Sequence, residues 1–186
     1  VVPSGVEHGT VTAEVGGPSF EITTMRHDIA TDGRHAVVAF PDDWEAYAAR
    51  RDLTMNALSL DTDGNLHDPI GGYADLMAGR VWFVGDPVQR ITEDVLRLLR
   101  FFRFHAHYGK VLPDADALAA CRAMAPNLPR LSAERVRVEL LKLLEAPDPM
   151  PTLELMRKAT VLENFLPEAM EIPRLARLVR IESVLL

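Results

Sequence analysis

The sequence predicts an α+β fold, with a head of mixed strands and helices followed by an all-helical neck. Two stretches near the N-terminus alternate apolar and polar residues with the period of a half-buried strand. After Gln89 the periodicity is that of helices, and prolines separate one helical stretch from the next. We therefore expect the chain to divide near Asp86, into a head at residues 1–86 and a neck at residues 87–186.

The alternating stretches, residues 10–15 and 19–25, are predicted to pair as an antiparallel hairpin. Gly16 and Gly17 lie between them and are typical of a tight turn. Residues 26–36 show no periodicity and are predicted to form an exposed loop. The rest of the predicted head comprises a strand at residues 37–40, a helix from 42 to about 51, a strand at 55–60, a short helix through Leu76 and a strand at 80–84.

The predicted neck contains five helices. They lie at residues 92–108, 114–125, 132–145, 152–159 and 172–186. Residues 90–109 are predicted to form one continuous helix with Thr92 as its N-cap. Its apolar arc and its charged arc lie on opposite sides at helical spacing: Val95, Leu96, Leu98, Leu99 and Phe102 on the first, and Glu93, Asp94, Arg97 and Arg100 on the second.

Asp94 and Arg97 on the charged arc allow two interpretations. Residues three apart on a helix are neighbours, so these two can form an ordinary surface ion pair. Alternatively, the carboxylate accepts a hydrogen bond from an exocyclic amino group while the guanidinium donates to the adjacent ring nitrogen. Cytosine and adenine present that pattern on their Watson–Crick edges, and guanine and uracil present the reverse. Spacing alone favours the ion pair, because structural ion pairs are common.

Composition and charge restrict the class of protein without identifying its function. The 186 residues carry a net charge of −7, with 48% hydrophobic and 25% charged residues, which is ordinary for a globular protein. The acidic balance argues against broad nonspecific binding to nucleic acid, which favours a basic surface. A single cysteine, Cys121, excludes an internal disulfide, and no apolar run is long enough to cross a membrane, so we expect a cytoplasmic protein.

Three motifs in order carry a resemblance to a known family. RRDLTMNAL at residues 50–58, DPIGGYADL at 68–76 and EDVLRLLRFFRF at 93–104 resemble the class II tRNA nucleotidyltransferase family, which comprises CCA-adding enzymes and bacterial poly(A) polymerases. EHGTVTA and FEITTMR upstream are similar to its head-domain strands. The resemblance covers residues 1–145 and implies a polymerase-β-like nucleotidyltransferase head. It also implies transfer of CMP or AMP from CTP or ATP to the 3′ end of tRNA or another RNA.

The resemblance implies roles for particular residues. The stretch containing Arg50, Arg51, Asp52 and Asn56 resembles the family's sugar- and phosphate-contacting motif. Two adjacent guanidiniums can grip a triphosphate, although a helix-terminal arginine pair that complements the helix dipole is the competing account. By the same resemblance Asp94 and Arg97 select cytosine or adenine, and Arg100 supports them.

The resemblance also implies a metal site. Nucleotidyl transfer uses divalent ions such as Mg²⁺ held by two carboxylates. The family carries them in an Asp-x-Asp segment before the strand at residues 10–15, and the sequence has no such segment. We therefore expect the main metal ligands upstream of Val1 and an inactive fragment as given. Glu21 on the second predicted strand is a candidate third carboxylate, or an ordinary solvent-facing residue.

Three functions remain open from the sequence. CCA addition and poly(A) addition both suit a carboxylate and a guanidinium that read cytosine or adenine. The missing Asp-x-Asp motif favours a third possibility, a non-catalytic RNA-binding protein that retains the head and neck. Because several nucleotide-binding motifs occur together, we favour an enzyme of tRNA CCA addition. The sequence does not predict the oligomeric state.

Overall fold

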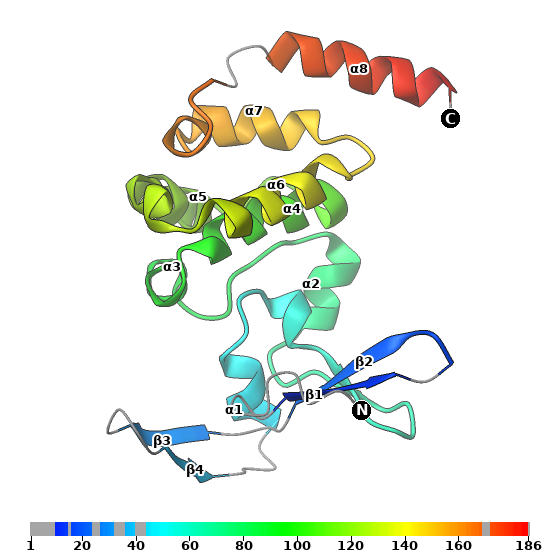
Figure 1. Ribbon diagram of the computed structural model, residues 1–186, viewed down its shortest axis with the longest axis vertical. Coiled ribbons are helices and arrows are strands. Elements are labelled where there is room, and N and C mark those ends of the chain that lie inside the picture. Colours follow the sequence, from blue (N-terminus) through cyan, green and yellow to red (C-terminus); the bar gives the residue numbers. More distant parts are fainter. Residues whose placement is uncertain are drawn as a thin grey trace. The chain divides into compact units, whose positions relative to one another are not determined.

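The computed structural model describes residues 10–14, 16–23, 27–31, 36–39, 44–168 and 172–185. The chain divides into two compact units, Val1–Tyr47 and Ala48–Leu186. This boundary reflects compactness alone, so the functional division near Asp86 stays a prediction. The mixture of small sheets and helices confirms the α+β class (Figure 1). None of the described helices is long and apolar enough to span a bilayer.

The first unit contains the predicted hairpin. Strand β1 (Thr10–Glu14) pairs antiparallel with β2 (Ser19–Thr23), with Thr12 opposite Glu21. The turn between them uses Gly16 and Gly17 at φ values of 64° and 109°, a region that glycine adopts without steric cost. The alternation of residues 10–25 therefore predicted this hairpin correctly.

A second hairpin follows, and here the predicted exposed loop at residues 26–36 is wrong in part. Strand β3 (His27–Thr31) pairs antiparallel with β4 (Ala36–Ala39). The register shifts between Asp28 and Ala30, which interrupts the alternation that would have revealed the strand. Helix α1 (Trp44–Ala49) comes next, and its predicted start at residues 41–42 lies outside the described residues.

The second unit begins with short elements. A 3₁₀ helix, η2 (Thr54–Ala57), occupies most of the predicted strand at residues 55–60, and only β5 (Ser59–Leu60) is extended, paired with β6 (Leu66–His67). The predicted strand at residues 80–84 is also wrong, since it makes only an isolated bridge between Leu53 and Phe83. Its apolar residues reflect burial under the helices rather than pairing in a sheet.

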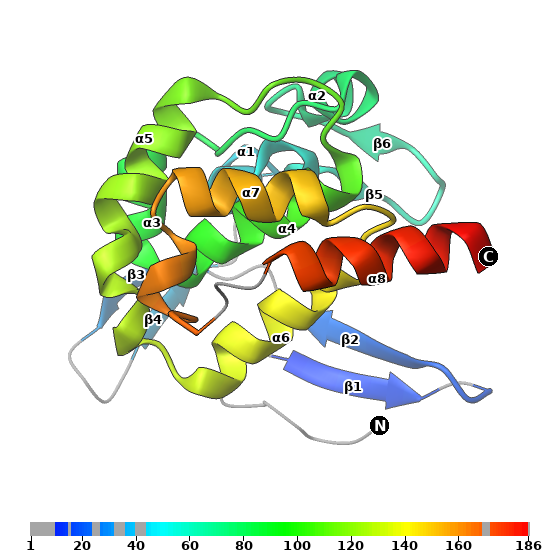
Figure 2. The same cartoon turned by 90° about the horizontal axis from the view of Figure 1, so that it is seen from above.

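The helical region follows the predicted spacing from residue 114 onward. Helices α5 (Ala115–Met124) and α6 (Ala133–Leu144) begin after the N-caps Asp114 and Ser132, whose side chains accept from the backbone N–H three residues on. Described residues after Gln89 include no strand, as predicted. The remaining elements are α2 (Gly72–Ala78), η3 (Ala125–Arg130), α7 (Met150–Lys158), η4 (Leu162–Asn164) and α8 (Ile172–Leu185), several of which Figure 2 shows from above.

The predicted single helix at residues 90–109 is in fact two helices. Helix α3 (Pro87–Glu93) ends at Asp94, whose φ of −152° and ψ of 109° are extended, and α4 (Leu96–Tyr108) then begins. Asp86 is the N-cap of α3, and its carboxylate accepts a hydrogen bond from Gln89 N at 2.7 Å. Pro87 is the first residue of the helix. Aspartate followed by proline is a stronger start signal than Thr92, because proline at the first helical position loses no hydrogen bond.

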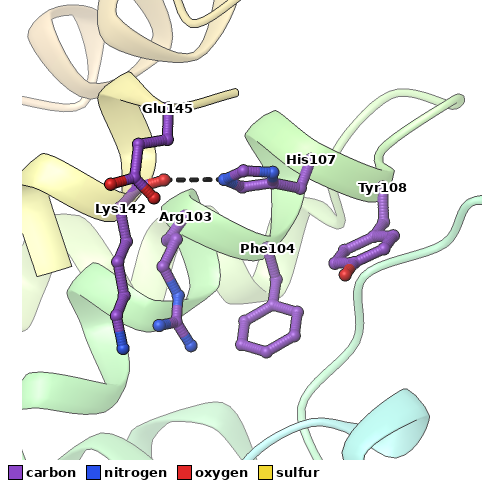
Figure 3. Close-up of a pocket in the computed structure, with 6 residues that line it drawn as sticks. All are labelled: Arg103, Phe104, His107, Tyr108, Lys142 and Glu145. Carbon is purple, nitrogen blue, oxygen red and sulfur yellow. Dashed lines mark hydrogen bonds between the residues drawn. The ribbon is translucent and has the colours of Figure 1, made fainter. Parts of the chain in front are cut away.

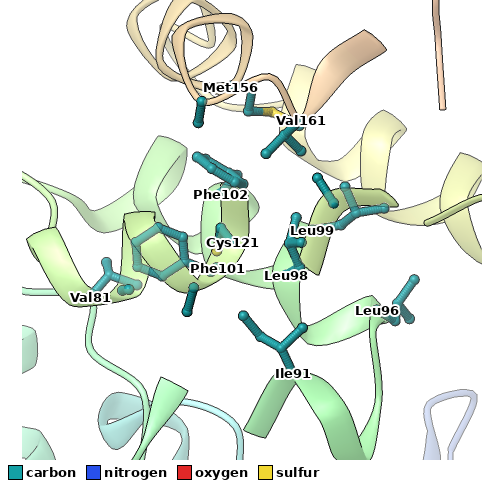
Figure 4. Packing of buried hydrophobic residues seen from close by; sticks show 14 of the residues in the cluster. Val81, Ile91, Leu96, Leu98, Leu99, Phe101, Phe102, Cys121, Met156 and Val161 are labelled. Carbon is teal, nitrogen blue, oxygen red and sulfur yellow. The ribbon is translucent and has the colours of Figure 1, made fainter. Parts of the chain in front are cut away.

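Helix α4 supplies the centre of the core. Leu98, Phe101 and Phe102 are fully buried, and Phe101 stacks on Phe83 at 5.4 Å between ring centroids. Figure 4 shows these side chains among residues of α3, α5 and α7. The predicted apolar arc is confirmed with Phe101 added, and Cys121 is buried as expected. One side of α4 is therefore fixed by packing, which holds its charged side in place.

Candidate functional site

Asp52 connects the segment after α1 to helix α4. Its carboxylate accepts from Arg100 Nε, from Asn56 Nδ2 at 3.0 Å and from Leu53 N at 2.9 Å. Burial on its own raises the pKa of Asp52, but the hydrogen bonds from Arg100, Asn56 and Leu53 and the charge of Arg100 lower it below its ordinary value. Asp52 is therefore a fixed anion, and Arg100 is its partner.

Arg97 lies one turn before Arg100 and binds the same segment. Its Nη2 donates to the backbone oxygen of Arg50 at 3.2 Å, while Nη1 donates to the Arg90 oxygen at 3.2 Å and to the Glu93 carboxylate. These contacts engage both hydrogens of Nη1 and one hydrogen of Nη2. The second Nη2 hydrogen and the Nε hydrogen take no part in these three bonds, so the guanidinium is held in place and still has two N–H groups that can donate to a ligand.

Asp94 pairs with Arg135 of α6 rather than with Arg97. Its Oδ2 accepts from Arg135 Nη2 at 2.7 Å, and its Oδ1 accepts from Leu96 N at 3.1 Å at the start of α4. The predicted Asp94–Arg97 pair required both residues to lie in one helix. The backbone of Asp94 is extended instead, so the two side chains do not have that helical spacing. The carboxylate is about one-third exposed, with side-chain accessibility of 36%.

Glu139 of α6 completes a buried group of charges beneath this surface. It is 5% exposed, its Oε2 lies 3.2 Å from Arg103 Nε, and its Oε1 lies 4.0 Å from Arg100 Nη1. Sequence reasoning assigned neither Glu139 nor Arg135 to this site. Their spacing of four residues, in register with buried Leu143, was the available signal, because it places both on the face of α6 that packs on α4.

The other candidate residues lie at the surface. The side chains of Arg50 and Arg51 are exposed at the end of α1. Glu21 is exposed on β2 in the first unit. Within the described residues, no group of three or more His, Cys, Asp or Glu side chains is placed to hold a metal ion.

Two family models match the chain. One is described as the poly A polymerase head domain and matches residues 1–82. The other is described as a probable RNA and SrmB-binding site of polymerase A and matches residues 113–172. The EDVLRLLRFFRF motif lies between the two matched regions.

Curated relatives and solved structures agree with the family models. The chain is 48% identical over 145 residues to the mitochondrial CCA tRNA nucleotidyltransferase 1 of Mus musculus, covering 75% of this chain and 33% of the mouse protein. It is 40% identical over 168 residues to a CCA-adding enzyme of Leuconostoc mesenteroides, covering 89% and 41%. The chain therefore spans about a third to two-fifths of the length of these relatives.

The Bacillus stearothermophilus CCA-adding enzyme in complex with CTP has a TM-score of 0.78 at 30% identity, covering 96% of this chain and 43% of that one. The Thermotoga maritima CCA-adding enzyme complexed with tRNA has a TM-score of 0.59 at 25% identity, covering 67% and 31%. From its ordered motifs, its head-and-helices fold and these matches, the chain belongs to the class II tRNA nucleotidyltransferase family of CCA-adding enzymes and poly(A) polymerases.

Proposed function

We propose that the protein containing this chain adds CMP and AMP from CTP and ATP to the 3′ end of tRNA without a nucleic-acid template. The names of the curated relatives support CCA addition, and the similar Bacillus structure is a complex with CTP. Within that enzyme, we assign residues 1–86 to part of the head and residues 87–186 to the neck. We keep a cytoplasmic location as part of the proposal, although some relatives are mitochondrial.

One observation carries the proposal for the site: α4 binds the Arg50–Asp52 segment at two points. Arg97 donates to the Arg50 oxygen, and Arg100 donates to the Asp52 carboxylate. The segment that the family resemblance assigns to sugar and phosphate is thus linked to the helix that it assigns to the base. A nucleotide bound there has its triphosphate beside Arg50 and Arg51 and its base beside the start of α4.

Asp94 and Arg97 would select the base. The Asp94 carboxylate is fixed by Arg135 and Leu96 N, yet each oxygen has a second lone pair for an exocyclic amino group. Arg97 has donors left over for the ring nitrogen beside that amino group. Cytosine and adenine satisfy both partners, whereas uracil and guanine would bring a carbonyl oxygen against the carboxylate. Arg100 supports this arrangement by holding Asp52, and Asn56 supports it from the opposite side of the same carboxylate.

Magnesium belongs to the proposal for the whole enzyme rather than to the described residues. A divalent ion would activate the attacking hydroxyl and stabilise the leaving pyrophosphate. The described residues provide no cluster to bind it, and Glu21 alone is one carboxylate. The contribution that we assign to the described residues is binding and selection of the nucleotide.

Poly(A) addition is the second candidate, because both matching family models describe poly(A) polymerase domains. A non-catalytic RNA-binding protein of the same fold is the candidate from another class. One assay separates all three. The native protein is supplied with tRNA lacking its 3′ CCA, with all four nucleotides and Mg²⁺, and the products are sequenced at their 3′ ends.

Addition of CCA supports the proposal, and a run of adenosines supports poly(A) addition. RNA binding without incorporation, under conditions in which the Leuconostoc mesenteroides enzyme is active, would overturn both and favour the non-catalytic protein.

A further inference from the structure

A second candidate site lies at the opposite end of α4 from Asp94. Six residues line a hollow of about 290 Å³ between the C-terminal halves of α4 and α6: Arg103, Phe104, His107, Tyr108, Lys142 and Glu145. Figure 3 shows Arg103, Phe104 and Lys142 extending in the same direction from the two helices. The volume is at the lower limit for ligand sites, which suits a single nucleotide rather than a larger molecule.

The floor of the hollow is aromatic. Phe104 and Tyr108 stack on successive turns of α4, with 5.8 Å between ring centroids and an interplanar angle of 26°. Phe104 packs partly into the core, whereas Tyr108 is 47% exposed. An exposed ring backed by a second ring is a rigid surface on which a flat base can stack.

The rim of the hollow is cationic and held by buried contacts. The Arg103 guanidinium lies 4.6 Å from the Phe104 ring centroid, and its Nε lies 3.2 Å from the buried Glu139 carboxylate. Lys142 is exposed on α6, and its backbone oxygen accepts from His107 Nε2 at 2.6 Å, which joins the two helices across the hollow. A phosphate group would find the exposed Lys142 ammonium beside the aromatic surface, with the Arg103 guanidinium, 13% exposed, next to it.

We propose that this hollow binds one unpaired nucleotide of an RNA, with its base stacked on Tyr108 and its phosphate beside Lys142 and Arg103. The combination of an aromatic surface with cations on one side is the arrangement that binds single-stranded nucleic acid without reading its sequence. The Glu145 carboxylate on the rim disfavours a purely anionic ligand, so a base is needed for binding. The choice of RNA as ligand rests on the proposed function.

The test uses the 186-residue chain and a fluorescein-labelled single-stranded RNA hexamer, with affinity measured by fluorescence anisotropy. Tyr108→Ala should weaken binding about tenfold, the loss expected for one base-stacking contact. Lys142→Gln should weaken binding and reduce the slope of log affinity against log salt by about one. Tyr73→Ala and Lys158→Gln, on α2 and α7, are the matched controls and should bind like the unaltered chain.

Tyr108→Leu keeps an apolar side chain of similar size but removes the aromatic ring. It replaces Tyr108→Ala in the binding test if the alanine variant fails to fold. The inference is overturned if the unaltered chain does not bind the hexamer, if folded Tyr108→Leu binds normally, or if the controls lose as much affinity. It is also overturned if duplex RNA competes as well as the single strand, because stacking would then play no part. CTP binding, measured in parallel, should not respond to Tyr108→Ala, so failure of this hollow is distinguishable from failure of the nucleotide site.

Discussion

The Arg100 guanidinium donates to the buried Asp52 carboxylate across 48 positions of sequence, and this contact fixes the Arg50–Asp52 segment on helix α4. Asp52 has only 6% of its side chain exposed, while Arg100 retains 32%. The pair is therefore desolvated mainly on the carboxylate side. Removing one partner should leave the other charge poorly compensated.

Asp52→Ala should destabilise the chain by about 2 to 4 kcal/mol, somewhat below the cost of breaking a fully buried pair, because Arg100 retains contact with solvent. Urea unfolding followed by circular dichroism measures the change. Glu134→Gln, which removes the exposed pair between Glu134 and Arg137, is the matched control and should change stability by less than about 1 kcal/mol. Equal effects from the two variants would show that the Asp52 contact contributes no more than a surface ion pair.

Gly72→Ala should destabilise the contact between η2 and α2. A Cβ at Gly72 would lie 2.0 Å from the backbone oxygen of Thr54, which cannot move as a flexible side chain can. The expected cost is about 1 to 3 kcal/mol or more, as for other overpacked positions. Gly64→Ala is the comparison, because nothing lies within 4 Å of its Cβ and its φ of 84° adds a backbone strain that Gly72 does not have. A larger loss of stability for Gly72→Ala than for Gly64→Ala would therefore come from the clash with Thr54, and an equal or smaller loss would contradict the prediction.

His105 should make stability depend on pH below neutrality. Burial lowers its pKa from the ordinary value of 6.5, an effect that the backbone of Val111 opposes in part. The unfolded chain therefore binds a proton at a higher pH than the folded chain. The stability that neutral His105 contributes is present above pH 6.5, and it is lost as the pH falls from 6.5 toward the lowered pKa.

The measurement is the urea midpoint of the chain and of His105→Gln between pH 5 and pH 7.5. The unaltered chain should lose stability on acidification, and His105→Gln should show a smaller loss over the same interval. His67→Gln is the control for replacing a histidine elsewhere. An identical pH slope in the unaltered chain and in His105→Gln would contradict the prediction.

The sequence predicted those elements whose signals are local. The hairpin turn at Gly16 and Gly17, the helix starts near Asp114 and Ser132 and the apolar arc of α4 each depend on residues within one or two turns. The strand β3 was missed because its register shift breaks the alternation. Strands were wrongly predicted at 55–60 and 80–84 because each is a short run of apolar residues, which is also the pattern of a buried strand. Here the residues are apolar because helices pack over them.

The candidate site, too, could be predicted only where the signal is local. The motifs identified the individual residues apart from Arg135, but the contacts of Arg100 with Asp52, of Arg97 with Arg50 and of Asp94 with Arg135 each join residues more than 40 positions apart. Nothing local in the sequence fixes such pairs. The break at Asp94 was missed because the periodicity of α3 continues almost in phase into α4.

The structure sharpens the test of Asp94 as the residue that selects the base. Asp94→Ala removes both the acceptor for Leu96 N at the start of α4 and the charge that binds Arg135. Asp94→Asn keeps the oxygen for Leu96 N and loses the charge. The asparagine variant is therefore the cleaner probe of selection, and the alanine variant measures the added structural cost.

In the native protein, Asp94→Asn should reduce the preference for CTP and ATP over UTP and GTP by about one to two decades, because a hydrogen bond to a charged group is worth about 1.5 to 3 kcal/mol. Incorporation efficiency is measured for all four nucleotides, with the melting temperature of each variant as a check on folding. Arg135→Gln is the control: it leaves the Asp94 carboxylate in place and should change selection less than Asp94→Asn does. If Asp94→Asn keeps the order and ratios of the four nucleotides, Asp94 is a structural residue that binds Leu96 N and Arg135, and the assignment of base selection to it is wrong.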